Sequence, residues 1–281
     1  MQFGNFEIYP IYDGFFALDG GAMFGVVPKV FWEKTNPPDN RNRITLALRT
    51  MLIKTPKELV LIDTGIGDKF QEKFKDIYRI DKSYTIENSL QAVGVKPDEI
   101  NIVINTHLHF DHCGGNTRVD NQGEVVPKFA NATYYIQEAE WKQAVNPDVR
   151  SKASYLLENF APLEKFGNLK LIDGDQEIIQ GVFVIKTAGH TKGHQIVLIK
   201  SEAKTCVYWG DLIPTVSHLN VPYVMGYDLF PLTTMEWKER LLAKALEEKW
   251  LLFFEHDPKH SFGYLKAKQD RWEFVPVPEN N

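Results

Sequence analysis

Residues 106–112 have the sequence THLHFDH and follow the β-branched run at residues 100–104. Neutral imidazoles and ionised carboxylates are the protein ligands that hold zinc, iron or manganese. A single histidine is more often a surface or core residue, but a cluster of this density behind a strand favours metal binding. If the chain stays extended, His107 and His109 point the same way and can bind one metal, while Asp111 and His112 can bind a neighbouring metal.

Composition sets limits on the class of protein. The 281 residues are 43% hydrophobic, which is enough for a substantial core, and we expect one domain over residues 1–281. A net charge of −5 without a polybasic block argues against a nucleic-acid partner. The cysteines, Cys113 and Cys206, do not suggest a disulfide framework. A signal sequence and a bilayer-length apolar run are not seen, so we expect a cytoplasmic protein without a membrane partner.

Strands and helices are expected from periodicity and from turn residues. The predicted strands lie at residues 6–12, 44–53, 59–62, 100–104, 134–136, 169–172, 182–187, 195–200, 205–209 and 251–254. The predicted helices lie at residues 85–93, 138–145, 151–160 and 233–249. A capping box at Thr233 and Glu236 is expected to open the last helix, in which Trp237 is a core residue. Residues 15–28 are apolar without a period and are predicted to form a long loop that enters the core or lines a pocket.

Several predicted strands end on histidine or aspartate residues, which can bind a metal or orient a metal ligand. Rigid strand ends of this kind can fix metal ligands, while the loops supply substrate contacts. An acid at a strand end, such as Asp63, is a turn former, a helix cap or a partner that orients a ligand imidazole. The further residues at strand ends are His190, His194, Asp211 and His256.

This ordered set resembles the motifs of the metallo-β-lactamase superfamily. The order is Asp63, His107-x-His109-x-Asp111-His112, His190, Asp211 and His256, and it covers nearly the whole chain. The resemblance implies an α/β (α+β) fold, the four-layer αββα sandwich, with a metal site at one edge of the two sheets.

The resemblance also implies two divalent metal ions, zinc in the first place, with iron, manganese or cobalt as alternatives. One metal would be held by His107, His109 and His190. The other would be held by Asp111, His112 and His256, with Asp211 bridging the two. Asp63 and His194 would orient these ligands. The His/Asp set departs from the Glu-containing motif of the flavo-di-iron branch, which argues against redox chemistry.

Within the superfamily the chain is similar to quorum-quenching N-acyl-homoserine-lactone lactonases and to methyl parathion hydrolases, notably in residues 19–29 and 211–215. One departure concerns the tyrosine that polarises the substrate carbonyl, which those lactonases place three residues after the bridging aspartate. Here that position is Pro214. Either Tyr223, Tyr227 or His218 replaces this tyrosine, or the substrate is different.

The chemistry follows from the metals. Two cations about 3.5 to 4 Å apart can bridge a water, lower its pKa from near 16 toward about 7 and so make hydroxide available. They also stabilise charge on a carbonyl or phosphoryl oxygen. Asp111 could then relay a proton to the leaving alkoxide, so Asp111 and Asp211 are the predicted catalytic residues.

Substrate contacts are predicted in the apolar segment and in the residues after Asp211. An apolar wall, suited to an acyl chain or an aromatic leaving group, is expected from Phe15, Met23, Phe24, Val27 and Trp32. Further substrate contacts are expected from His218, Tyr223 and Tyr227. His260 is expected to be structural or exposed, and Cys113 a small packing residue.

We therefore expect a hydrolase of small, partly apolar esters, and specifically a lactonase acting on a small-molecule lactone. The alternatives are a phosphotriesterase, a thioester hydrolase resembling glyoxalase II, and a catalytically idle metal-binding module. A homodimer is left open.

Overall fold

The computed structural model describes residues 1–268 and 271–278, and the chain divides into two compact units. Unit 1 comprises residues 1–14 and 48–174, and unit 2 comprises residues 15–47 and 175–281. The single domain expected over residues 1–281 stays a prediction. Among the described residues, none of the helices has the length and apolar character needed to cross a membrane.

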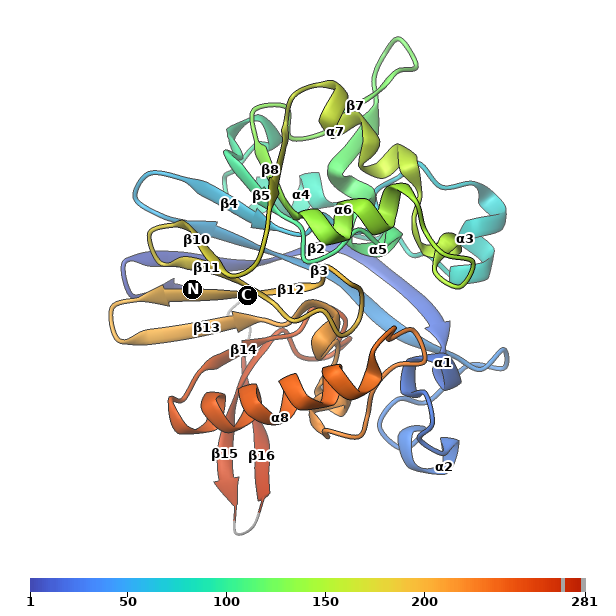
Figure 1. Cartoon of the computed structure of the whole chain (residues 1–281), viewed down its shortest axis with the longest axis vertical. Helices are drawn as coiled ribbons and strands as arrows, with labels where there is room; N and C mark the ends of the chain where they lie inside the picture. Colours follow the sequence, from blue (N-terminus) through green and yellow to red (C-terminus); the bar gives the residue numbers. More distant parts are fainter. Residues whose placement is uncertain (269–270, 279–281) are drawn as a thin grey trace. The chain divides into compact units, whose positions relative to one another are not determined.

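Unit 1 is built on a mixed sheet with the strand order β1-β2-β3-β4-β5-β8-β9 (Figure 1). Strands β4, β5, β8 and β9 pair in parallel. The strands are β1 (Gln2–Phe3), β2 (Phe6–Asp19), β3 (Arg43–Lys54), β4 (Leu59–Ile62), β5 (Ile102–Ile104), β8 (Thr133–Gln137) and β9 (Leu169–Ile172), and β6 (Thr117–Val119) pairs separately with β7 (Val125–Pro127). Residues 15–19 of β2 and 43–47 of β3 are counted in unit 2. The strands predicted at residues 59–62 and 100–104 and the helix predicted at residues 85–93 are confirmed as β4, β5 and α4.

The helices of unit 1 bury apolar side chains against this sheet. Leu90 of α4 and Trp141 of α6 share a core cluster with Leu61 and Val103 of the parallel strands. Helix α4 begins after Thr85, whose hydroxyl accepts a hydrogen bond from the Asn88 N–H at 3.2 Å. The helices are α3 (Glu72–Tyr78), α4 (Ile86–Ala92), α5 (Phe110–Cys113), α6 (Glu138–Val145) and α7 (Ala161–Lys165).

The helix predicted at residues 151–160 is wrong. This segment forms two short 3₁₀ turns, Lys152–Ser154 and Leu157–Asn159, before α7 begins. The Asp148 carboxylate accepts hydrogen bonds from the N–H groups of Arg150 and Ser151, both at 2.9 Å. Such side-chain bonds offer the backbone an alternative to helical pairing, which explains the difference.

Unit 2 is built on a second sheet, in the order β10-β11-β12-β13-β14-β15-β16, with α8 packed on it (Figure 1). All neighbours are antiparallel except β13 and β14, which are parallel. The elements are β10 (Gln176–Ile179), β11 (Val182–Lys186), β12 (Gln195–Ser201), β13 (Lys204–Tyr208), β14 (Leu251–Phe253), β15 (Phe262–Lys268), β16 (Arg271–Val277) and α8 (Pro231–Glu247). The strands predicted at residues 195–200 and 205–209 are confirmed as β12 and β13, which form an antiparallel hairpin.

Helix α8 begins earlier than predicted. It starts at Pro231, and no side chain caps its first turn, so the expected capping box at Thr233 and Glu236 is wrong. Proline is favoured at the first helical position because its φ angle is already helical and its missing N–H would be unpaired there. Trp237 is partly buried and packs against the core cluster of Leu241, Leu242 and their neighbours.

The long loop predicted at residues 15–28 is also wrong in its first part. Strand β2 continues to Asp19, and the short helices α1 (Gly20–Phe24) and α2 (Lys29–Trp32) follow. The Asp19 carboxylate caps α1 by accepting a hydrogen bond from the Ala22 N–H at 2.8 Å. Phe24 stacks on Trp32 with ring centroids 5.3 Å apart, and both side chains are buried. These side chains therefore belong to the core of unit 2.

Candidate metal centre

In unit 1, the predicted ligands follow two parallel strands whose carboxyl ends meet at the same edge of the sheet. Asp63 comes directly after β4, and Thr106 follows β5. One Asp63 oxygen accepts the Thr106 backbone N–H at 2.8 Å and the other accepts the Thr106 hydroxyl at 2.7 Å. Asp63 has a φ of 57°, a left-handed conformation that aspartate tolerates better than most residues. Asp63 therefore fixes the start of the histidine segment.

Asp63 also orients His112. The Nδ1 of His112 lies 3.2 Å from Oδ2 of Asp63, so the ring carries its proton on Nδ1 and presents the lone pair of Nε2. A carboxylate oxygen of Asp111 lies 3.7 Å from this Nε2. Two ligand-type atoms therefore face the same region from adjacent residues of α5.

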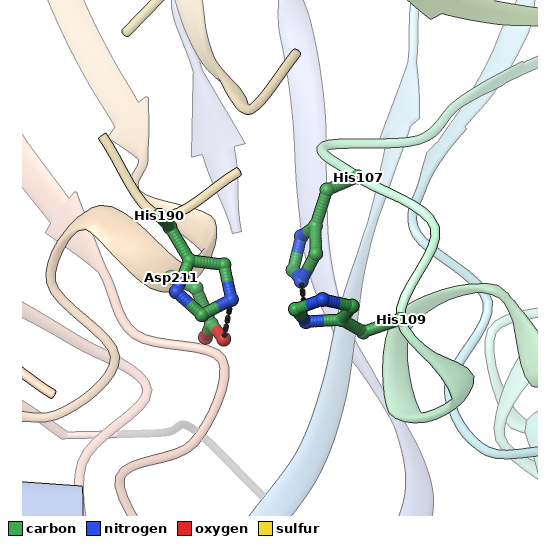
Figure 2. A group of neighbouring side chains, drawn as sticks. All are labelled: His107, His109, His190 and Asp211. Carbon is green, nitrogen blue, oxygen red and sulfur yellow. Dashed lines mark hydrogen bonds and ion pairs between the residues drawn. The ribbon is translucent and has the colours of Figure 1, made fainter. Parts of the chain in front are cut away.

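His107 and His109 form the other pair in unit 1. The Nε2 of His107 lies 3.1 Å from the Nδ1 of His109, and the rings meet edge to face (Figure 2). Both rings are buried, and both belong to a set of side chains that could hold a metal ion. Two imidazole nitrogens aimed at one point suit a borderline metal such as zinc.

Glu140 of α6 supports this segment, and no motif in the sequence indicates this role. Its buried Oε1 accepts the Leu108 backbone N–H at 2.9 Å and the Tyr155 hydroxyl at 3.0 Å. The Tyr155 ring lies 4.9 Å from the ring of His109. Burial, and then the nearby Glu140 carboxylate, raises the pKa of the Tyr155 hydroxyl, so this group remains a hydrogen-bond donor.

Cys113 ends α5 next to the predicted ligands. Its Sγ lies 3.2 Å from the Leu108 carbonyl oxygen, and burial raises the pKa of its thiol. A protonated, buried thiol is a packing group and not a thiolate ligand.

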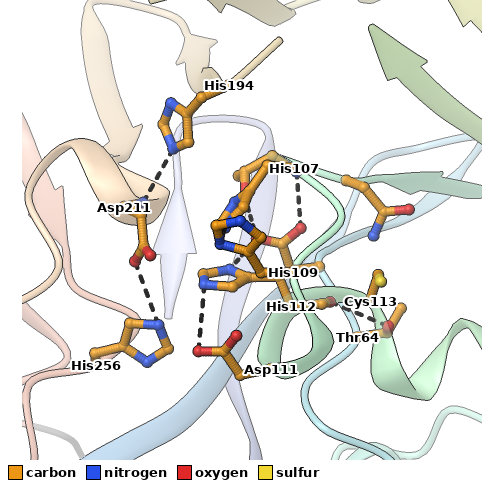
Figure 3. Close-up of polar contacts among 12 residues, drawn as sticks. Thr64, His107, His109, Asp111, His112, Cys113, His194, Asp211 and His256 are labelled. Atoms are coloured by element: carbon orange, nitrogen blue, oxygen red, sulfur yellow. Dashed lines mark hydrogen bonds and ion pairs between the residues drawn. The ribbon is translucent and has the colours of Figure 1, made fainter. Parts of the chain in front are cut away.

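In unit 2, Asp211 lies between two imidazoles. Its Oδ2 is 3.1 Å from Nε2 of His190 (Figure 2), and its Oδ1 is 3.4 Å from Nε2 of His256 (Figure 3). Asp211 follows β13 and His256 follows β14, and the parallel pairing of these strands places both at one edge of the sheet. Each oxygen of one carboxylate therefore faces a different predicted ligand.

The two imidazoles present their Nε2 atoms because other groups bind their Nδ1 atoms. The Nδ1 of His190 is 2.8 Å from Oδ1 of Asp228, and the Nδ1 of His256 donates to the Ala47 carbonyl at 2.8 Å. Asp228 is buried, and its other oxygen accepts the Met225 N–H. Asp228 is the functional residue that sequence reasoning missed. It lies 38 residues from His190 and outside every recognised motif.

His194 has a different arrangement. Its Nε2 accepts the backbone N–H of Asp211 at 3.0 Å, and its Nδ1 lies 2.7 Å from the Thr187 hydroxyl. Both ring nitrogens thus have partners within the protein, and the ring fixes the backbone at Asp211 (Figure 3). This geometry suits the predicted orienting role of His194.

The residues predicted to contact substrate differ from one another in burial and in hydrogen bonding. His218 is buried, and its ring nitrogens lie 2.7 Å from the Thr215 hydroxyl and 2.8 Å from the Met23 carbonyl. Burial lowers the pKa of His218 to about 3. Met23 and Phe24 are also buried, whereas Tyr223 and Tyr227 are partly exposed. Substrate binding by these residues stays a prediction.

The profile of the metallo-beta-lactamase superfamily matches residues 49–256. The chain therefore belongs to the metallo-β-lactamase superfamily, and the predicted fold class is confirmed. The protein is a hydrolase of this superfamily, with lactonases among its relatives.

Particular relatives agree with this assignment. An N-acyl homoserine lactonase of Bacillus cereus is 30% identical, and the match covers 79% of this chain and 86% of the relative. The crystal structure of a probable metal-dependent hydrolase from Staphylococcus aureus matches with a TM-score of 0.92 and 31% identity, covering 99% of each chain. An N-acyl homoserine lactone hydrolase, solved with N-hexanoyl-L-homoserine at its catalytic metal center, matches with a TM-score of 0.69 and 25% identity, covering 90% of this chain and 93% of that one.

Proposed function

We propose that this protein is a two-metal lactonase that opens N-acyl homoserine lactones or similar lactones. The observation that carries the proposal is the environment of Asp211. Its two oxygens face the Nε2 atoms of His190 and His256, and both imidazoles hold their protons on the opposite nitrogen. A carboxylate placed in this way suits a bridge between two cations.

The proposed ligand sets are those that the family resemblance implies. One metal is assigned to His107, His109 and His190, and the other to Asp111, His112 and His256, with Asp211 shared. The donor set contains only imidazole and carboxylate, which fits zinc and leaves iron, manganese and cobalt as alternatives. When bound, the metals supply Lewis acidity and an activated water at neutral pH.

The protein's own groups complete the reaction. Asp63, Asp228 and the Ala47 carbonyl hold protons on the Nδ1 atoms of three ligands and so keep their Nε2 atoms available. Attack of water on the lactone carbonyl would form a new C–O bond and break the ring C–O bond, and the leaving alkoxide would take up the proton that the water loses. We assign the relay of this proton to Asp111, whose side chain is 9% exposed.

The substrate assignment follows the relatives, which are N-acyl homoserine lactonases and an N-acyl homoserine lactone hydrolase. Pro214 stands where the lactonases carry their carbonyl-polarising tyrosine. His218 already has protein partners at both ring nitrogens, so we assign the missing contact to Tyr223 or Tyr227. The homodimer and the cytoplasmic location stay predictions.

A substrate panel tests the proposal. Hydrolysis rates would be compared for N-acyl homoserine lactones of several chain lengths, a simple lactone, an aryl ester, a phosphotriester and a thioester. We expect the highest kcat/KM for a lactone. A higher value for the phosphotriester or the thioester would replace the lactonase assignment with that activity.

A ligand variant and a matched control extend the test. His109→Ala should remove turnover together with about one metal equivalent, measured by elemental analysis, because a ligand is lost. His260→Ala removes a histidine outside the proposed ligand set and should retain both metals and the wild-type rate. Full activity of His109→Ala with reduced metal content would contradict the mechanism, and two metals without hydrolysis of any substrate would favour the idle metal-binding module.

A further inference from the structure

Lys238 is a charged residue that lies wholly inside unit 2. It belongs to α8, and its exposed fraction is 0%. Its ammonium donates hydrogen bonds to the main-chain carbonyls of Asn220 and Tyr223 at 2.9 and 2.7 Å. A buried ammonium costs free energy unless polar partners or an opposite charge compensate it. An apolar side chain of similar length could fill the same space without this cost, so the charge calls for an explanation.

The two carbonyls belong to the segment that carries Asp228. This segment, residues 220–230, has further fixed points. Gly226 donates to the Ala22 carbonyl at 2.7 Å, and Leu229 donates to the carbonyl of His190 at 3.1 Å. The segment is thus hydrogen-bonded to the backbone of His190 near its C-terminal end and to Lys238 of α8 near its N-terminal end. Its conformation determines where the Asp228 carboxylate meets the His190 ring.

Charge links Lys238 to Asp228 as well. Asp228 is 2% exposed and directs one oxygen to Nδ1 of His190. Burial lowers the pKa of the Lys238 ammonium to about 7, while attraction to Asp228 acts in the opposite direction. The Asp228 charge therefore favours the protonated form of Lys238 inside the protein.

We propose that Lys238 is a positioning residue for the metal ligand His190, acting through Asp228. Its ammonium ties down residues 220–223 and so fixes the segment that carries Asp228, whose carboxylate holds the proton of His190 on Nδ1 and leaves Nε2 available. This inference rests on the proposed function only in treating His190 as a metal ligand. A purely structural lysine would stabilise the fold without affecting the state of the His190 ring.

The first experiment removes the charge and keeps the length of the side chain. Lys238→Met is compared with Lys244→Met, which changes a half-exposed lysine of the same helix. We expect Lys238→Met to bind one of two zinc equivalents about 10 to 100 times more weakly in chelator competition, as when other partners of ligand imidazoles are lost. The ¹⁵N signals of His190 in the metal-free protein should also change tautomer. Lys244→Met should match the wild type in both measurements.

A double-mutant cycle with Asp228→Asn shows whether Lys238 acts through Asp228. Asp228→Asn alone should weaken binding of the same zinc equivalent. Adding Lys238→Met to this variant should reduce the zinc affinity by less than a further twofold. Additive losses, or unchanged zinc affinity in folded Lys238→Met, would overturn the proposal. If Lys238→Met does not fold, recovery of folding in the double variant supports the coupling, whereas failure of both assigns Lys238 a structural role and overturns it.

These measurements do not use a substrate. If wild-type protein binds two zinc ions but hydrolyses no lactone, the lactonase proposal fails while the zinc and tautomer comparisons still decide the role of Lys238.

Discussion

The two units present their predicted metal ligands in different ways. In unit 1, four of the ligands fall within six residues after β5, and Asp63 and Glu140 hold their backbone. In unit 2, His190, Asp211 and His256 come from separate strand ends, and each imidazole has its own orienting partner. The first set depends on the conformation of one segment, and the second depends on the pairing of distant strands. Substitutions should therefore have local effects on backbone stability in unit 1 and selective effects on ligand orientation in unit 2.

Among the substitutions in unit 2, Asp211→Asn is expected to reduce activity most. The change keeps the shape but removes the charge shared by the Nε2 atoms of His190 and His256. We expect kcat/KM to fall by more than about 100-fold, beyond the usual loss for an orienting partner, with reduced metal content. Steady-state kinetics and elemental analysis measure both effects. Retention of two metals and near-normal kcat/KM would show that Asp211 does not bridge.

Asp63→Asn and Asp228→Asn compare the orienting carboxylates of the two units. Asparagine tolerates the left-handed φ of residue 63, so the backbone strain stays similar while the charge is lost. Each variant should bind zinc about 10 to 100 times more weakly. Asp63→Asn should lower the free energy of unfolding more, because Asp63 accepts both the N–H and the hydroxyl of Thr106. Chelator competition measures the zinc affinities, and urea unfolding of the metal-free proteins measures the free energies of unfolding. Equal decreases in the free energy of unfolding would show that the two carboxylates do not differ in this respect.

His218 gives a smaller, pH-dependent effect within unit 2. Burial lowers its folded-state pKa to about 3 from 6.5, so the unfolded chain binds more protons between these values. Its contribution to stability is fully present above pH 6.5 and is lost as the pH falls, by about 1.4 kcal/mol per pH unit. His218→Phe should reduce this slope in urea unfolding between pH 4.5 and 7. An unchanged slope would show that other groups cause the acid sensitivity.

The sequence indicates the strand-end ligands well and their orienting partners poorly. Apolar runs that are followed by ligand-type residues identify β4, β5, β13 and β14, because the strand pattern and the ligand-type residues occur together locally in each case. Asp228 and Lys238 carry no such local signal, since each acquires its role only when residues 220–230 contact the His190 turn and α8. The errors at residues 15–19 and 151–160 have other origins. Strand pairing extends β2 past Gly14, and the Asp148 side chain diverts the backbone from a helix.

The parallel pairing of β13 and β14 has a consequence for the order in which the chain can assemble. Parallel neighbours need a crossover, and here residues 209–250, including α8, form it. A nascent chain that stops before Leu251 already contains Asp211 but lacks the neighbouring strand that leads to His256. If Asp211 and His256 bind a cation as proposed, this binding must await synthesis of β14, long after the THLHFDH segment has left the ribosome.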